Sequence, residues 1–170
     1  ETVLLLSAMM QDELGGRVLL IDATLRDGGI GALLGAQGQP GLSEARADDL
    51  QSLAALIRPL HRQSLFLLGA GLVPAASRAA DMAGIVSTLA QDFDHIVIQQ
   101  QAITADTRYL AMAGQADLVL LLAEEGRSRM AALTLCRDTF HANGIDNVGL
   151  ILTVPPAATD GPVNAGVMAA

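Results

Sequence analysis

The feature that most constrains the fold is a short apolar run, Val18–Ile21, that ends on an acidic residue, Asp22. Consecutive branched apolar residues are typical of a strand that is buried on both faces, as in a parallel sheet covered by helices. In open α/β sheets, ligands bind just beyond the carboxyl ends of such strands. The run therefore predicts a buried parallel strand, with Asp22 at the edge of the sheet where a ligand site would lie.

Apolar runs alternate with segments of helical periodicity along most of the chain. Strands are expected at Val3–Ser7, Val18–Ile21, Leu65–Leu68, Ile96–Ile98, Leu118–Leu122 and Val148–Val154. Helices are expected at Asp48–His61, Ser77–Asp92, Asp106–Gly114 and Arg127–Asn143, the last of which is closed by a left-handed cap at Gly144. This alternation predicts an α/β fold in which helices cover both faces of a mostly parallel sheet.

One domain is expected over residues 1–154, followed by a flexible tail at residues 155–170, which are rich in Pro, Gly, Ala and Thr. One connection does not fit this scheme. Only Ala8–Arg17 separates the first two expected strands, and a parallel crossover through a helix needs roughly a dozen residues or more. Either these strands form an antiparallel pair, or a loop that belongs near residues 9–11 has been deleted or left out.

The composition argues against several classes of function. The formal net charge is −8 and aromatic residues make up 2% of the chain, whereas nucleic-acid surfaces need clustered basic residues and stacking rings. The single cysteine, Cys136, excludes an internal disulfide framework. The histidines lack metal-ligand spacing, so no metal site is expected. Without a membrane-spanning apolar run or a signal peptide, a cytoplasmic protein is expected.

A series of segments resembles the bacterial tyrosine kinases (BY-kinases) and, less closely, the MinD/ParA-like P-loop ATPases. The segment that starts at Asp22 and ends at Arg26 resembles the Asp-x-Asp-x-Arg motif of BY-kinases, with Thr24 in place of the second acid. Further segments that resemble the family, in order, are Leu33–Gly35, Pro40–Glu44, Leu67–Gly71, Phe93–Ile98, Asp117–Leu122 and Gly144–Leu152. The resemblance implies a P-loop NTPase-like fold of the MinD/ParA/BY-kinase type.

At the positions where such proteins carry their chemistry, this sequence differs. It contains no lysine and no Gly-Lys-Ser/Thr phosphate-binding loop. Thr24 offers no charge for magnesium or for activating water, and Gln99 stands where the next family motif begins after its strand. Thr153 stands where the family has an asparagine that contacts the base. The pattern predicts a degenerate, non-catalytic relative in which no residue is assigned a catalytic role.

The resemblance implies a remnant of a nucleotide-binding site, without metal. Its residues would be Asp22, Thr24, Arg26, Gln99, Asp106 and Thr153. Each has a structural alternative: an acid after a strand caps the turn that follows, and an acid before a helix caps its first turn. For Asp22, the structural role is the favoured interpretation.

The function expected from the resemblance is that of a non-catalytic partner of a membrane chain-length (co-polymerase) protein in bacterial exopolysaccharide synthesis and export. The segment Ser43–His61 is a candidate contact surface, a homo-oligomer is a further option, and no cofactor is expected. The protein would be cytoplasmic, or peripheral at the inner membrane through its partner. The alternative is an active, ATP- and magnesium-binding tyrosine autokinase, or a MinD/ParA-like ATPase, whose phosphate loop is missing. The only tyrosine, Tyr109, lies outside the tail, so the family's tail autophosphorylation is not expected.

Overall fold

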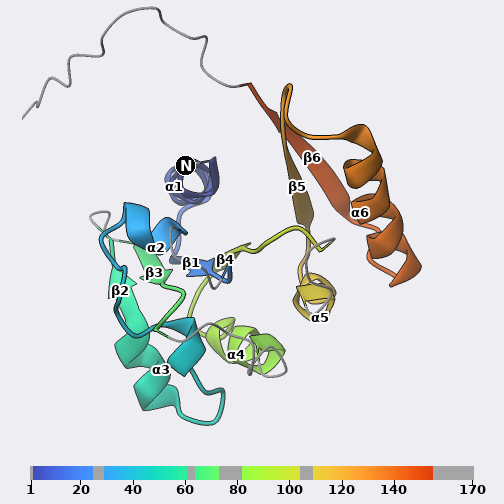
Figure 1. Ribbon diagram of the computed structural model, residues 1–170. Helices are drawn as coiled ribbons and strands as arrows, with labels where there is room; N and C mark the ends of the chain where they lie inside the picture. Colours follow the sequence, from blue (N-terminus) through green and yellow to red (C-terminus); the bar gives the residue numbers. More distant parts are fainter. Residues whose placement is uncertain (1, 25–28, 61–63, 73–81, 104–108, 155–170) are drawn as a thin grey trace, which may run out of the picture.

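The computed structural model describes residues 2–24, 29–60, 64–72, 82–103 and 109–154, and alternates helices with strands along the chain (Figure 1). The elements are α1 (Thr2–Leu14), β1 (Val18–Asp22), α2 (Ile30–Leu33), a 3-10 turn (Leu42–Glu44), α3 (Leu50–Leu56), β2 (Ile57–Pro59), β3 (Leu65–Leu68), α4 (Met82–Leu89), β4 (His95–Gln99), α5 (Leu110–Ala113), β5 (Val119–Glu124), α6 (Met130–Ala142) and β6 (Val148–Thr153).

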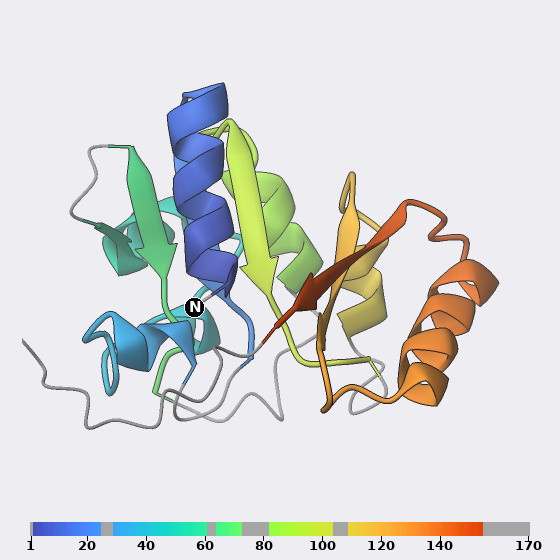
Figure 2. The ribbon, with the colours of Figure 1, turned by 90° about the horizontal axis from the view of Figure 1, so that it is seen from above.

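The strands form two sheets. The larger one has the order β2-β3-β1-β4, in which β1 runs parallel to both β3 and β4, and only β2 is antiparallel. The smaller sheet pairs β5 with β6 in parallel. Helix α1 lies on one face of the larger sheet, and α3 and α4 lie on the other (Figures 1 and 2). The expected α/β fold with a mostly parallel sheet and helices on both faces is confirmed.

Strand β1 is the centre of the larger sheet, and all of its residues are buried. Alternate residues of a strand point to opposite faces. Leu19 and Ile21 point into the cluster beneath α3 and α4. Leu20 packs instead with Ile30 of α2 and Leu67 of β3, on the face that α1 covers. This two-sided burial explains why the sequence of β1 is a continuous apolar run rather than an alternating one.

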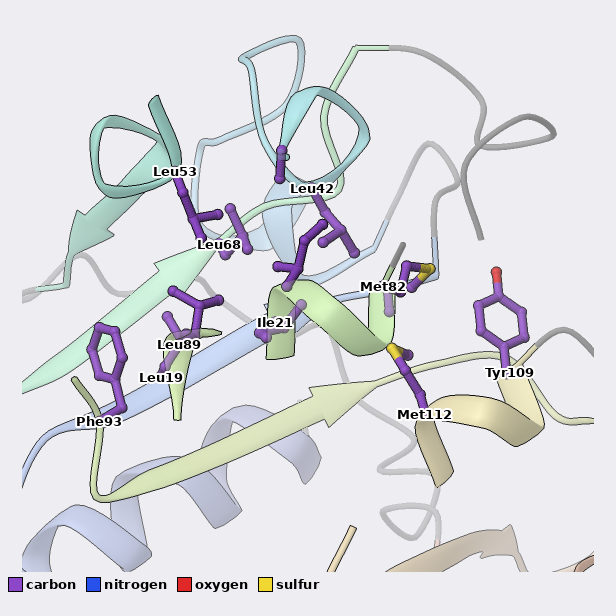
Figure 3. Packing of buried hydrophobic residues seen from close by; sticks show 13 residues of the cluster. Leu19, Ile21, Leu42, Leu53, Leu68, Met82, Leu89, Phe93, Tyr109 and Met112 are labelled. Atoms are coloured by element: carbon purple, nitrogen blue, oxygen red, sulfur yellow. The ribbon is translucent and has the colours of Figure 1, made fainter. Parts of the chain in front are cut away.

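The main core lies between β1, β3 and the helices α3 and α4 (Figure 3). Leu53 of α3 and Leu89 of α4 are almost completely buried over the sheet. Farther along, Met112 of α5 joins the same cluster, and Tyr109 packs beside it. The core therefore ties the first half of the chain to α5, which precedes the smaller sheet.

The amino end of β1 is fixed by Arg17. Its guanidinium group lies 5.1 Å from the ring centre of Phe66 and 4.6 Å from that of Phe93, a stacked cation–π arrangement. The Arg17 side chain also donates to the carbonyl oxygen of Asp92 at 2.8 Å, and its backbone N–H donates to Asp94 Oδ2 at 2.7 Å. These contacts join the start of β1 to the turn before β4.

The expectation of a strand at Val3–Ser7 is wrong, because these residues belong to the helix α1. The apolar run there is part of a longer helical segment, and Ser7 Oγ donates to the carbonyl oxygen of Val3 one turn earlier. A short apolar run cannot by itself distinguish a buried strand from a buried helix. The antiparallel pair of first strands is therefore also wrong, and α1 runs through residues 9–11 without interruption.

The helix expected at Asp48–His61 is too long. Asp49 caps α3 by accepting a hydrogen bond from Ser52 N, but the helix ends at Leu56 and the chain continues into the edge strand β2. Proline disfavours helical geometry in the residue before it, so Pro59 keeps Arg58 extended. His61 lies outside the described residues.

The remaining expected strands and helices are present, and the described helices are shorter than expected. The strands β3 to β6 lie where apolar runs were expected, and Gly144 adopts φ of 73° after α6, as expected for its cap. The first parts of the helices expected at Ser77–Asp92 and Asp106–Gly114 lie outside the described residues, as does the expected tail at 155–170. None of the described helices combines the length and apolar character needed to cross a membrane.

Truncating the centre of β1 tests this account of the core. Leu19 is completely buried, so we expect Leu19→Ala to lower the free energy of unfolding by about 2–5 kcal/mol. The control is Leu50→Ala, because Leu50 is 63% exposed on α3; it should change stability by less than about 0.5 kcal/mol. Denaturant titration of both variants checks the prediction, and equal losses would contradict the placement of β1.

Candidate functional site

The carboxyl ends of β1 and β4 lie side by side. Asp22 and Gln99 are partners in the parallel register, and the N–H of Ala23 donates to the carbonyl oxygen of Gln99 at 2.8 Å. The next polar residues on each side are also joined, because Gln101 Nε2 donates to the carbonyl oxygen of Thr24 at 2.7 Å. The structure thus brings together three of the residues expected from the sequence, Asp22, Thr24 and Gln99.

The carboxylate of Asp22 is buried, with 1% of the residue exposed, and both of its oxygens accept hydrogen bonds. Oδ1 accepts from the backbone N–H of Thr24 at 3.1 Å and from Thr24 Oγ1 at 2.6 Å. Oδ2 accepts from the N–H of Gly31 at 3.1 Å, across the loop that joins β1 to α2. The acid therefore holds this loop closed, as acids after strands commonly do in turns.

Glycine is needed beside this carboxylate. A side chain on Gly29 would collide with Asp22 Oδ2 and lie close to Thr24 Oγ1. The space around the carboxylate is therefore filled by loop backbone. The carboxylate of Asp22 is thus buried, and the backbone of Gly29 blocks access of a cation from its side. Both features favour the structural role of Asp22 over the binding of a cation.

A second acid, Glu44 in the 3-10 turn, also holds loop backbone by accepting hydrogen bonds, here beside the loop that follows β3. Glu44 Oε2 accepts from Gly41 N at 2.8 Å, and Glu44 Oε1 accepts from Ser43 Oγ at 2.5 Å. Its carboxylate also accepts from Leu72 N at 3.2 Å, which links two loops. Sequence analysis missed this residue as a functional or structural acid. Glu44 makes the returning half of a capping box to Gly41 N, but Gly41 has no side chain for the other half, so the sequence motif that would identify this acid is absent.

Gln99 differs from these acids because its side chain is not satisfied. Gln99 Oε1 is buried and has no hydrogen-bond partner within the part of the chain that the structure describes. A buried amide oxygen without a donor is costly, so an N–H or O–H group is expected to reach it. An amide is neutral, however, and supplies no charge for magnesium.

Of the other residues predicted for the site, Thr153 is the one that the structure describes, and it does not join this group. Thr153 lies at the end of β6 in the smaller sheet, where its hydroxyl donates to the carbonyl oxygen of Ala123 at 3.1 Å. Arg26 and Asp106 lie outside the described residues. Among the described residues, the structure therefore brings together Asp22, Thr24 and Gln99, with Gln101 from the same polar run as Gln99.

A magnesium–nucleotide group does not fit the described residues. Magnesium needs oxygen ligands with carboxylate charge in near-octahedral geometry. The only acid among the three grouped residues, Asp22, is occupied by three donors, and the described residues contain no cluster of three potential metal ligands. Residues 1–170 contain no lysine, so among them only arginine can offer a positive side chain to phosphate at neutral pH. The amino terminus of α1, which lies at the same edge of the sheet, favours anions only through its dipole (Figure 2).

Replacing the carboxylate of Asp22 separates its two possible roles. Asn has one acceptor fewer, so Asp22→Asn should leave a donor of Thr24 or Gly31 unsatisfied and lower stability by about 1–3 kcal/mol without magnesium. The control is Asp48→Asn, because the Asp48 side chain is 72% exposed. A variant that is equally or more stable, and that differs only in its response to magnesium, would show that Asp22 is a metal ligand. Thermal melting with and without magnesium checks this.

Comparisons with known proteins found similarity to a curated protein and to solved structures. No protein-family profile matches it. It is 28% identical over 140 residues to the tyrosine-protein kinase ptk of Acinetobacter johnsonii, which covers 80% of this chain but only 19% of that relative. The chain thus spans about a fifth of the length of the curated relative that it matches.

Solved structures share the fold. The kinase domain of VpsO superimposes with a TM-score of 0.73 at 24% identity, over 89% of this chain and 74% of that one. A ParA family ATPase from Chlorobium tepidum gives a TM-score of 0.71 at 14% identity, over 86% of this chain and 64% of that one. At these identities the structural matches show the fold alone. Together with the sequence match, they confirm the resemblance: the chain has the α/β fold of BY-kinase and MinD/ParA-like domains, and its sequence is similar to that of a BY-kinase.

Proposed function

We propose that this chain is a non-catalytic, BY-kinase-like protein that acts in bacterial exopolysaccharide synthesis or export. In this proposal it is a cytoplasmic partner of a membrane chain-length (co-polymerase) protein and needs no bound nucleotide. The setting comes from the resemblance to BY-kinases. The loss of catalysis comes from the residues at the carboxyl edge of the larger sheet.

The observation that carries the proposal is the engagement of Asp22. Both of its oxygens hold the loop after β1, and the neighbouring positions carry Thr24 and Gln99 instead of further acids. Phosphoryl transfer depends on positioning and on charge neutralisation by metal and basic groups. The carboxylate of Asp22 accepts hydrogen bonds from the loop, and Thr24 and Gln99 beside it are neutral. This arrangement supports a protein that keeps the fold but does not catalyse phosphoryl transfer.

Tyr109, the one tyrosine of residues 1–170, is poorly placed to accept phosphate. Tyr109 is 5% exposed and packs beside Met112 in the main core. A phosphate acceptor must reach the active site of its own or a neighbouring molecule, which a buried side chain cannot do without local unfolding. Autophosphorylation of this residue is therefore not part of the proposed function.

The candidate partner surface is smaller than the segment Ser43–His61. Ser43 and Ala45 are buried, and His61 lies outside the described residues. Helix α3 buries Leu53 but exposes most of its other residues, including Leu50. The exposed side of α3 is therefore the part of this segment that remains available for the co-polymerase partner.

Phosphate release and tyrosine phosphorylation test the loss of catalysis. We expect the complete protein, with ATP and magnesium, to release no phosphate above buffer and to acquire no phosphotyrosine, because Thr24 and Gln99 supply no charge for the reaction. An active BY-kinase domain, assayed in parallel, is the positive control. Magnesium-dependent turnover by the purified protein would overturn the proposal in favour of the autokinase or ATPase alternative.

A genetic test addresses the setting. Deleting the gene in the bacterium that encodes it should lower extracellular polysaccharide, and both the wild type and Gln99→Ala should restore it, because Gln99 has no catalytic role in the proposal. Extracellular polysaccharide is measured together with protein abundance. Unchanged polysaccharide in the deletion strain would contradict a role in exopolysaccharide synthesis or export. If Gln99→Ala is present at normal abundance but does not restore polysaccharide, Gln99 has a role that the proposal does not give it.

A further inference from the structure

Helix α6 covers the face of the smaller sheet that points away from α1 (Figure 1). Two of its side chains, Cys136 and Phe140, are buried in the small core over β5 and β6. After α6, the chain turns back toward β6 through Asn143 and Gly144. The junction between α6 and β6 therefore depends on how these two residues are held.

The end of α6 is a Schellman motif. The N–H of Gly144 donates to the carbonyl oxygen of His141 at 3.0 Å, and the N–H of Ile145 donates to that of Phe140 at 3.0 Å. Gly144 takes the left-handed conformation that such a cap requires, with φ of 73°. Phe140 and Ile145 belong to the same buried apolar cluster, as residues at these two positions of the motif commonly do. Two hydrogen bonds and an apolar cluster thus close the cap.

Asn143 is exposed at this cap and directly precedes a glycine. Asparagine is thermolabile because the backbone nitrogen of the next residue can attack its side-chain Cγ and displace the amide. Glycine in the next position favours this attack, since it has no Cβ to hinder the approach and its backbone rotates freely. Asn147, the one other asparagine among the described residues, is also exposed but precedes the β-branched Val148.

The folded cap holds the two reacting groups of this pair apart. Nδ2 of Asn143 donates to the carbonyl oxygen of Thr139 at 2.8 Å. The attacking nitrogen, that of Gly144, is engaged with His141. Ring closure needs this nitrogen to turn toward Cβ of Asn143, whereas at the observed ψ of 15° it is turned away. The last turn of α6 must therefore open before the reaction can start.

We propose that Asn143 is a deamidation site whose reaction is controlled by the cap of α6. When the last turn opens, the nitrogen of Gly144 forms a bond to Cγ of Asn143. The bond from Cγ to Nδ2 breaks, and the proton of the Gly144 N–H passes through solvent to the leaving ammonia. Water then adds to one of the two carbonyl carbons of the cyclic imide and opens the ring. Residue 143 is left as aspartate or isoaspartate, without any oxidation or reduction.

The product weakens the cap that controls its formation. A carboxylate cannot donate a hydrogen bond to the carbonyl oxygen of Thr139, so the contact made by Asn143 is lost. It also places a negative charge at the carboxyl end of α6, where the helix dipole disfavours an anion. Asp146, whose Oδ1 lies 2.5 Å from His141 Nδ1, already supplies one acid to this turn. Deamidation therefore loosens the junction between α6 and β6, whatever the activity of the protein.

Peptide mass spectrometry of the complete protein tests the proposal. The protein is kept at one neutral pH for increasing times, both folded and in urea, and conversion is measured separately at Asn143 and Asn147. In urea, Asn143 should convert faster than Asn147, because only Asn143 precedes glycine. In the folded protein, Asn143 should convert about tenfold more slowly than in urea, which corresponds to about 1.4 kcal/mol for opening the last turn.

Two matched substitutions identify the cap as the control. Ile145→Ala removes the apolar side of the cap and should raise the folded rate at Asn143 toward the rate in urea. Ile103→Ala makes the same change in the same buried cluster but outside the cap, so it should leave that rate nearly unchanged. Asn143→Asp introduces the product carboxylate and should speed the hydrogen exchange of the Gly144 and Ile145 amides.

Three results would overturn the proposal. If Asn143 converts no faster than Asn147 in urea, the pair with Gly144 is not reactive. Equal rates at Asn143 in the folded protein and in urea would mean that the cap does not control the reaction. Equal acceleration by Ile145→Ala and Ile103→Ala would assign the control to global unfolding instead. If Ile145→Ala does not fold, the comparison of the folded protein with urea still decides whether the fold restrains Asn143.

Discussion

The rest of the structure depends on β1, a strand buried on both faces that ends in a buried acid. Its apolar residues place one cluster beneath α3 and α4 and another beneath α1. Arg17 fixes its amino end between two aromatic rings, and Asp22 fixes its carboxyl end by accepting hydrogen bonds from the following loop. The residues that determine the fold and those expected to determine function therefore overlap at Asp22.

In the proposed function, this overlap is the reason that the domain would keep its fold without its chemistry. A buried carboxylate that accepts three hydrogen bonds contributes to stability regardless of whether a ligand binds, so its presence is not evidence of catalysis. Glu44 likewise accepts hydrogen bonds from loop backbone, beside the loop that follows β3. The similarity to kinase and ATPase domains shows a shared architecture, whereas activity requires charged groups that Thr24 and Gln99 do not provide.

The sequence predicted the fold where a pattern had one physical reading. Val18–Ile21 follows Gly15 and Gly16, which interrupt a helical segment, and it forms the central strand β1. Val3–Ser7 has the same composition but lies within α1, because tertiary packing on the sheet, rather than local propensity, decides between the two states. The edge strand β2 was missed because its pairing with β3 is a long-range contact that leaves no periodic signal in three residues.

The candidate site was predicted in part. Parallel strands bring their carboxyl ends together, which is why Asp22 and Gln99 could be placed side by side. Thr153 could not be separated from them, because the division into two sheets is invisible in the sequence. The hydrogen bonds of Asp22 agree with a structural role, but its partner Gly31 could not be foreseen, since the loop geometry sets that contact.

The most direct test of the central claim, that Asp22 serves the fold and does not bind a metal, is nuclear magnetic resonance of the ¹⁵N-labelled complete protein titrated with manganese and ATP. Manganese bound at the carboxylate would broaden the amide signals nearest to it. The account predicts that the signals of Thr24 and Gly31 broaden no more than those of exposed loops. Selective, saturable broadening of these two signals would contradict it and identify the carboxyl edge of β1 as a working metal–nucleotide site.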